Sequence, residues 1–294
     1  MSQRVRTTGE VSGRRGLGWL PDYPDLRDFS VENREVYQLL AKTAVKKTKK
    51  GPSKVDLREW CSPVEDQGQI GSCTAHAGVG MLEYFERKLN GRHIDGSRRF
   101  LYKVTRALAQ IEGDSGAFLR TTMGAMVLFG IPPEDYWPYS EAEFDEDPPS
   151  FCYAFAQNYQ AAKYYRLDPP GTDRPEILDA IRSHLASQLP AMFGFTVYGS
   201  ISQAGEDGRI PFPGKGDKVA GGHAVMAVGY DNSKTVPKPG GETKGAILIR
   251  NSWSADWGEN GYGWLPYDYV LRGLAGDWWV LIDSEWVDTG EFKP

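Results

Sequence analysis

Apolar residues repeat every three to four positions over residues 75–89, and this spacing predicts an amphipathic helix. Two glycines, Gly78 and Gly80, interrupt the stripe. A glycine inside a helix costs about 1 kcal/mol relative to alanine, so the pair indicates a close backbone contact with a neighbouring element. We expect this helix to be the central one of its half of the chain.

The pattern differs between the two halves of the chain. Helical spacing recurs at 97–109 and 119–129. Beyond residue 159, strands are predicted at 160–167, 192–198, 223–230, 246–250, 262–265 and 278–282, with one helix at 173–188. A helical half followed by an antiparallel half predicts an α+β architecture with a cleft between two lobes.

Residues 1–52 have a different composition from the rest and form a separate N-terminal segment. A basic, glycine-rich start is followed by an extended, proline-containing stretch at 19–28, a short amphipathic helix at 32–45 and a lysine-rich linker. A disordered tail is one interpretation. The apolar residues Trp19, Tyr23 and Phe29 favour the other, a strap anchored over the cleft. We expect residues 53–294 to form the main domain.

Composition narrows the classes of function. The net charge of −5 and pI of about 5.5 argue against nucleic-acid or anionic-membrane binding as the main activity. Only three cysteines are present, and there is no signal-peptide or membrane-spanning apolar run. We therefore expect a monomer that is cytoplasmic, or exported without a recognisable signal peptide. No metal-ligand cluster or phosphate loop is evident, and no cofactor is expected.

Cys73 follows the glycine-flanked turn Gly68–Ser72 and begins the first predicted helix. Free N–H groups and aligned peptide dipoles at a helix start stabilise negative charge, which lowers a thiol pKa. For a lone cysteine a buried, inert role is the commoner one. The residues around it favour a nucleophile.

A nucleophilic thiol needs a base, a group that orients the base, and donors for the developing oxyanion. His223 begins one predicted strand and Asn251 follows the next, so a hairpin between the two strands places them side by side. Gln67 lies six residues before Cys73 and offers a side-chain donor. His76, one turn after Cys73, is a rival base without an evident orienting partner.

These segments together resemble the papain family of cysteine peptidases, in particular its bacterial, cathepsin-like members. The matching segments occur in the family's order and span about residues 55–285. They are Asp56–Arg58, Pro63–Gly68, Gly71–Cys73, Asp114–Gly116, Trp137–Tyr139, His223–Val225, Gly229–Tyr230, Asn251–Trp253 and Trp257–Tyr262. Each motif alone is weak, but the ordered set is specific.

The resemblance implies a helical lobe at about 60–158, a β lobe at about 159–285, and catalytic roles for Cys73, His223, Asn251 and Gln67. It also implies that Gly116, Phe118 and Gly222 bind substrate, and that the N-terminal segment is the counterpart of a pro-segment, as in a zymogen. The sequence departs from the family pattern at Ile70, Thr74, Ser254 and Asp256, where family members often have cysteine, an aromatic residue and glycines.

The implied activity is endopeptidase cleavage through an acyl-enzyme, restrained by the N-terminal segment. Two alternatives remain at this point: a transpeptidase or ligase with the same nucleophile, and a catalytically silent peptide-binding protein. Substrate preference is also open, since Phe118 favours an apolar side chain in the nearby pocket and Asp277 a basic one.

Overall fold

The computed structural model describes residues 15–42, 51–161 and 163–282. Its helices are α1 (Arg34–Lys42), α2 (Cys73–Asn90), α3 (Arg98–Leu108), α4 (Leu119–Leu128), α5 (Ser150–Ala156), α6 (Arg174–Ala186) and α7 (Asp268–Leu271). Its strands are β1 (Trp19–Leu20), β2 (Lys54–Asp56), β3 (Ala117–Phe118), β4 (Lys163–Arg166), β5 (Ala191–Tyr198), β6 (Val219–Lys238), β7 (Gly241–Arg250), β8 (Tyr262–Pro266) and β9 (Ala275–Ile282).

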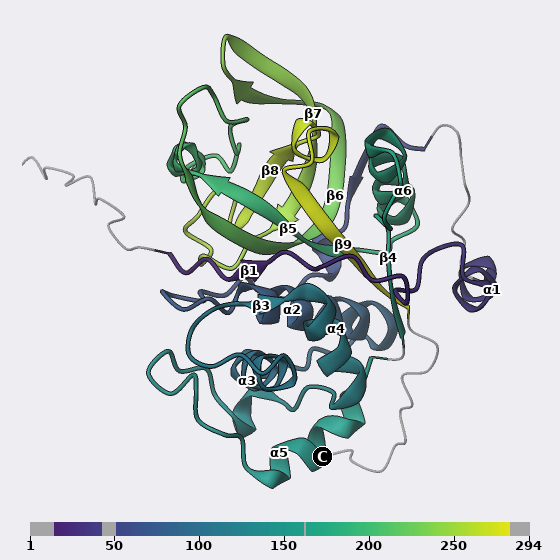
Figure 1. Cartoon of the computed structure of the whole chain (residues 1–294), viewed down its shortest axis with the longest axis vertical. Helices are drawn as coiled ribbons and strands as arrows, with labels where there is room; N and C mark the ends of the chain where they lie inside the picture. The colour runs from purple at the N-terminus through teal and green to yellow at the C-terminus, as the bar shows by residue number, and fades with distance from the viewer. Residues whose placement is uncertain (1–14, 43–50, 162, 283–294) are drawn as a thin grey trace, which may run out of the picture.

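Helices α2 to α5 form one lobe, drawn in the lower half of Figure 1. The long helix α2 is its centre, with α3 and α4 packed against it. The glycines of α2 explain this packing. A Cβ at Gly78 would lie 3.0 Å from the Met126 sulfur of α4, and one at Gly80 would lie 2.7 Å from Arg250 of β7. The expected close contact is therefore made on two sides of the helix.

The second lobe is a mostly antiparallel sheet of seven strands among the described residues. Its order is β4-β9-β5-β6-β7-β8, with β2 paired to β6 off this path. The buried faces of β5, β6 and β7 carry continuous apolar runs because helices cover them, as α2 and α6 do for β6. The predicted α+β architecture with two lobes is confirmed.

The hairpin of β6 and β7 is longer than the sequence pattern indicates. Its strands continue through residues 231–238 and 241–245, with Lys238 paired to Gly241 across a tight turn. These residues lack a strong alternation of apolar and polar side chains, because this end of the hairpin is largely exposed. Helix α5 was also not predicted; it is only seven residues long and begins after Pro149.

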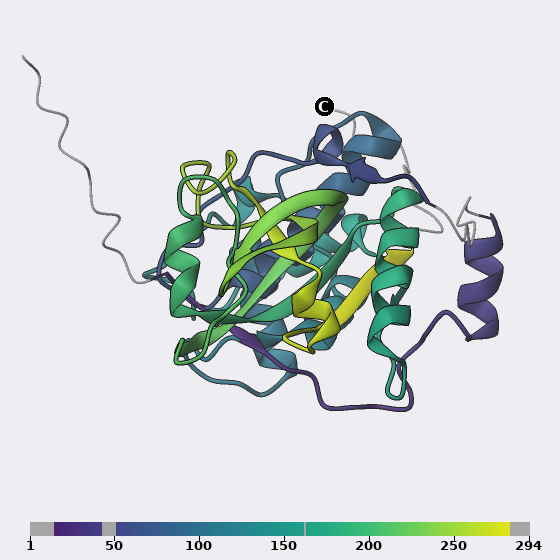
Figure 2. The same ribbon diagram turned by 90° about the horizontal axis from the view of Figure 1, so that it is seen from above.

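Residues 15–30, called the strap below, cross the molecule between the two lobes (Figure 1). Strand β1 of the strap pairs in parallel with β3, which joins Trp19 to Ala117 and Leu20 to Phe118. Beyond the strap, α1 lies at the outer edge of the molecule on the side of α6, as Figure 2 shows from above. The described part of the N-terminal segment is therefore packed against both lobes.

Candidate active site

Cys73 is the first residue of α2 and lies at the boundary between the lobes. Its side chain has no exposed surface, and its sulfur accepts a hydrogen bond from the backbone N–H of Ala224, at 3.4 Å. Burial raises the pKa of the thiol to about 11, although the N–H groups of Ala224, Gly18 and Thr74 oppose this shift. The predicted lowering of the pKa is thus wrong for this structure, because the burial of the thiol outweighs the effect of the surrounding N–H groups.

His223 lies in β6 and Asn251 directly follows the neighbouring strand β7, as the predicted hairpin requires. His223 Nε2 lies 2.8 Å from Asn251 Oδ1, which also accepts the N–H of Ser252 at 2.9 Å. Since Oδ1 can only accept, Nε2 carries the proton and Nδ1 is the free base. Trp253 stacks on the imidazole with ring centroids 4.6 Å apart, and this shields the hydrogen bond. Burial lowers the pKa of His223 to about 4 against the effect of Asn251.

The side chain of Gln67 is fixed at both ends of its amide. Its Oε1 accepts a hydrogen bond from Ser252 Oγ at 2.6 Å, so Nε2 points the other way and donates to the carbonyl oxygens of Gly16 and Ile70 at 3.1 and 2.9 Å. Tyr139 donates its hydroxyl hydrogen to the Gln67 carbonyl at 2.8 Å. The amide N–H₂ is therefore presented to the strap on the same side as Cys73.

The strap approaches the turn before Cys73 very closely through two glycines. A Cβ at Gly16 would lie 2.0 Å from the Ile70 oxygen, and a Cβ at Gly18 would lie 1.9 Å from the Gly71 oxygen. The Gly18 carbonyl also accepts the N–H of Ala117 at 2.8 Å. Only residues without a side chain fit here, so the strap backbone lies directly over the turn before Cys73.

The three residues expected to bind substrate all contact the strap. Gly116 has φ +79°, and a Cβ there would lie 2.2 Å from the Gly18 oxygen. A Cβ at Gly222 would lie 2.5 Å from the Trp19 backbone oxygen. Phe118 pairs with Leu20 in β3, and its ring lies 6.5 Å from that of Tyr23. The surface that is expected to bind a peptide is covered by the chain's own segment.

His76, the rival base, lies one turn into α2 and is buried. Its Nδ1 is 3.1 Å from the Ser72 carbonyl oxygen, and its ring packs edge-on against Tyr139 with centroids 5.1 Å apart. Burial lowers the pKa of His76 to about 3. These contacts give it the environment of a packed, neutral imidazole, and no described group orients it toward Cys73.

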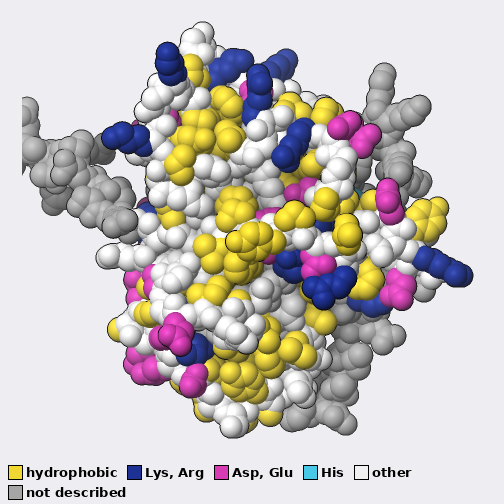
Figure 3. Space-filling model, viewed as in Figure 1, with side chains coloured by type: hydrophobic (Ala, Val, Ile, Leu, Met, Phe, Trp, Pro, Cys, Tyr) yellow, Lys and Arg dark blue, Asp and Glu magenta, His cyan; other side chains and the backbone are white. Residues whose placement is uncertain are grey.

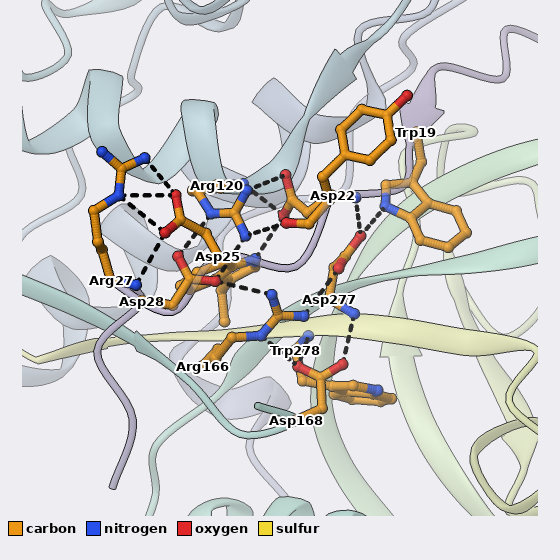
Figure 4. A network of polar contacts seen from close by, with 12 residues as sticks. Trp19, Asp22, Asp25, Arg27, Asp28, Arg120, Arg166, Asp168, Asp277 and Trp278 are labelled. Atoms are coloured by element: carbon orange, nitrogen blue, oxygen red, sulfur yellow. Dashed lines mark hydrogen bonds and ion pairs between the residues drawn. The ribbon is translucent and has the colours of Figure 1, made fainter. Parts of the chain in front are cut away.

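The strap is held by polar contacts that the sequence pattern did not predict. Of the expected anchors, Trp19 is partly buried, whereas Tyr23 and Phe29 are 79% and 42% exposed. The carboxylates of Asp22 and Asp28 take their place. Figure 4 shows Asp28 between Arg120 and Arg166, and Asp22 beside Arg120. Arg120 donates to Asp28 at 2.7 Å in a partly buried ion pair. The expectation that apolar anchors dominate is corrected for these two residues.

Figure 3 shows the face that carries the strap, with hydrophobic side chains near its middle and mixed acidic and basic side chains to their right. Among the described residues, no group of three or more His, Cys, Asp or Glu is arranged to hold a metal ion. None of the described helices has the length and apolarity that crossing a membrane requires. The three cysteines are free thiols in the structure.

The geometry places a thiol, an oriented imidazole and a fixed amide around one point between two lobes. A sequence profile described as papain family cysteine protease matches residues 51–270 of the chain. The chain belongs to the papain family of cysteine proteases. Its fold, with a helical lobe and an antiparallel β lobe, is the papain-like fold.

Two similar proteins align with more than nine tenths of the chain. An uncharacterized peptidase C1-like protein of Acanthamoeba polyphaga mimivirus is 32% identical over 91% of this chain and 86% of its own length. Xylellain, a cysteine protease from Xylella fastidiosa, is 33% identical over 95% of this chain and 100% of its own, with a TM-score of 0.73. Peptidase 1 of Euroglyphus maynei is 28% identical over 75% of this chain, which spans 62% of that relative.

Proposed function

We propose that this papain-family protease is an endopeptidase that uses Cys73, His223, Asn251 and Gln67, and that its own strap restrains it. The observation that carries the proposal is the convergence of these four side chains beneath the strap. The nucleophile begins α2, the base lies in β6, and its orienting amide directly follows β7. Gln67 precedes the turn that contacts Gly16 and Gly18.

The first chemical step follows from the tautomer of His223. Its free Nδ1 takes the thiol proton, and the sulfur attacks the peptide carbonyl carbon while the carbonyl oxygen becomes an oxyanion. The Gln67 amide N–H and the backbone N–H of Cys73 stabilise that charge. Asn251 keeps the imidazole in the correct tautomer as it becomes charged.

In the second half of the reaction, His223 acts first as an acid and then again as a base. The tetrahedral species collapses, the C–N bond breaks, and His223 gives its proton to the departing amine, which leaves an acyl group on Cys73. His223 then takes a proton from water, whose oxygen attacks the thioester carbonyl. The C–S bond breaks, the acid product leaves, and the thiol is reprotonated.

The strap supports a role as a tethered inhibitor because it covers the residues that are expected to bind a peptide. It pairs with β3, covers Gly116 and Gly222, and takes the Gln67 amide as a donor to Gly16. Since it is part of the chain, its effective concentration at the cleft is high without tight contacts. We propose that residues 1–52 act as a pro-segment-like regulator of the domain that follows.

The test is hydrolysis of an unstructured protein substrate by the full chain and by Cys73→Ala, with Cys61→Ala as the matched control thiol. We expect Cys73→Ala to abolish cleavage while its melting temperature stays close to that of the parent, and Cys61→Ala to retain activity. Internal fragments identified by mass spectrometry indicate endopeptidase action. Activity that survives in Cys73→Ala, or fragments that appear as amine adducts only when an amine is added, would contradict the proposal.

A further inference from the structure

The hydroxyl of Tyr139 joins the two ends of the turn before the nucleophile, residues 67–72. It donates a hydrogen bond to the backbone carbonyl of Gln67 at 2.8 Å, and it lies 2.6 Å from the hydroxyl oxygen of Ser72. Neither Gln67 nor Ser72 has any exposed surface. A single side chain, 67 to 72 positions away along the chain, therefore bridges the turn.

The directions of these hydrogen bonds follow from what each atom can do. The Gln67 carbonyl can only accept, so the Tyr139 proton points to it, and the Tyr139 oxygen accepts the hydrogen bond of Ser72 Oγ. Burial raises the pKa of Tyr139 above its ordinary value of 10.0, so the hydroxyl remains a donor. Tyr139 is therefore a fixed link with one hydrogen bond to each end of the turn.

Ser72 lies at the start of α2, where a serine side chain commonly accepts an N–H of the first helical turn. It makes no such hydrogen bond. Its hydroxyl is directed to Tyr139 instead, although a capping hydrogen bond would stabilise the helix. The link to Tyr139 thus replaces a general stabilising contact, which indicates that the link has a role of its own.

His76 fixes the same end of the turn through the backbone. Its Nδ1 lies 3.1 Å from the Ser72 carbonyl oxygen and 3.4 Å from Ser72 Oγ. The proton of Ser72 Oγ is directed to Tyr139, so Nδ1 must itself carry a proton and donate a hydrogen bond to the carbonyl. The backbone N–H of His76 bonds the same oxygen, also at 3.1 Å. The Ser72 carbonyl is therefore held by two donors.

The two ends of the turn carry the two donors proposed for the oxyanion. One is the side-chain amide of Gln67. The other is the backbone N–H of Cys73, which shares a peptide unit with the Ser72 carbonyl. A carbonyl that accepts hydrogen bonds polarises its peptide unit and makes the N–H at the other end a stronger donor. The separation and the strength of the two donors thus depend on Tyr139, Ser72 and His76.

Tyr139 is itself held by the helical lobe and not by the strap. Its ring packs edge-on against His76 of α2, with centroids 5.1 Å apart, and its backbone N–H donates to Glu134. Two residues earlier, the Trp137 carbonyl accepts a hydrogen bond at 2.5 Å from the hydroxyl of Ser97, which precedes α3. Both partners of the Tyr139 hydroxyl also lie outside the strap. Release of the strap therefore removes none of these hydrogen bonds.

We propose that Tyr139 is a positioning residue, which keeps the Gln67 amide and the Cys73 N–H at the separation that the oxyanion requires. This inference rests on the proposed peptidase function. Placement matters because a misplacement of about 1 Å can reduce a rate about 10²-fold. Without the Tyr139 hydroxyl, the bridge between the two ends of the turn is lost, while the nucleophile and the base are unchanged.

Tyr139→Phe removes this bridge and keeps the ring that packs on His76. The full chain is assayed with a fluorogenic peptide amide whose sequence is taken from a cleavage site in the unstructured protein substrate. It is also treated with iodoacetamide, which alkylates Cys73 without forming an oxyanion. Both reactions need an open strap, so their ratio on one preparation does not depend on how many molecules are open. We expect kcat to fall about tenfold with KM little changed, and alkylation to stay within about twofold.

Tyr84→Phe is the matched control, because Tyr84 also donates a hydrogen bond to a backbone carbonyl, that of Gln188 at 3.0 Å. It removes the same group from a site outside the turn, so the ratio of hydrolysis to alkylation should equal that of the parent. Ser72→Ala breaks the bridge at its other end and should lower the same ratio. Because both variants remove one bridge, the double variant should lose little more than Tyr139→Phe alone.

An equal loss of hydrolysis and alkylation in Tyr139→Phe, or an unchanged ratio in the folded variant, would overturn the inference while the peptidase function stands. Losses that multiply in the double variant would overturn it as well. If Tyr139→Phe does not fold, the ratio in Ser72→Ala decides between the same outcomes. If neither the parent nor Asp22→Asn, which weakens the strap, hydrolyses any peptide, the proposed function fails, and the inference fails with it.

Discussion

At the scale of single residues, the site depends on side chains held in one orientation by a second partner. Asn251 Oδ1 accepts hydrogen bonds from His223 Nε2 and from the backbone N–H of Ser252, so the amide cannot turn over without losing both. Gln67 is fixed in the same way by Ser252 Oγ. Ser252 thus connects Asn251, the proposed orienting group, with Gln67, the proposed oxyanion donor.

This connection predicts a selective effect of Ser252→Ala. Without the hydroxyl, Gln67 can turn its oxygen toward the oxyanion, so amide hydrolysis should fall about tenfold, less than the roughly 10²–10³-fold loss typical of removing a donor. Alkylation of Cys73 by iodoacetamide forms no oxyanion and should change little. The ratio of the two rates, measured on one preparation, cancels any change in strap position. Equal losses in both reactions would show that Ser252 acts only on the thiol or on the fold.

At the scale of elements, the strap combines an inserted apolar ring, that of Trp19, with ion pairs of Asp22 and Asp28 that hold the segment in place. Asp22 is placed by Trp279 and by the backbone N–H of Arg120, both at 3.1 Å to its Oδ2. Burial and the neighbouring charge of Asp277 raise the pKa of Asp22 to about 7, and Arg120 opposes this. The surrounding charged groups are Asp28 on the strap and Arg166 and Asp168 on the β lobe.

The direction in which pH changes the docking of the strap follows from the difference between the pKa of Asp22 in the docked and in the released state. Released from the cleft, Asp22 titrates near its ordinary pKa of 3.8, and docking raises that pKa to about 7. The docked strap therefore takes up a proton, so docking is strongest at low pH and weakens as the pH rises through about 4 to 7. Burial raises the pKa of Asp277, whereas its hydrogen bonds from Asp22 and Trp19 of the strap lower it.

We therefore expect the strap to open more readily at pH 8 than at pH 5. Hydrogen exchange of the strap amides, corrected for the intrinsic pH dependence of exchange, measures this opening without using the thiol. In Asp22→Asn, which cannot titrate at this position, the dependence should be much flatter. Stronger protection of the strap at pH 8 than at pH 5 would contradict this interpretation.

At the scale of the whole molecule, the sequence predicted most of what is local. The apolar stripe gave α2, the β-rich pattern gave the second lobe, and the motifs around Cys73, His223 and Asn251 located the elements that meet at the cleft. These features depend on residues that are close in sequence or in a recurring order. The structure brings together all four predicted catalytic residues and the three predicted substrate contacts.

The contacts of the strap were not predictable because they join distant residues without a periodic pattern. Asp22 and Trp19 meet Asp277, some 255 and 258 positions away, and a scattered aspartate in a proline-rich stretch looks the same whether it is solvated or paired. Exposed Tyr23 and Phe29 show that apolar composition alone did not identify the anchors. The close approach of Gly16 and Gly18 has no signal beyond the glycines themselves.

The central claim is that the strap closes a working protease site over Cys73. It is tested most directly by the rate at which a peptide-based, thiol-directed irreversible inhibitor labels the full chain, followed by intact mass and peptide mapping. The parent is compared with the double variant Trp19→Ala, Asp22→Asn, which removes the inserted ring and weakens the ion pairs that hold the strap. Cys73→Ala is the control for labelling at the two other cysteines. We expect one label per chain, at Cys73, formed at least about tenfold faster in the double variant. Equal rates in a folded double variant, or labelling at Cys61 or Cys152 instead, would contradict it.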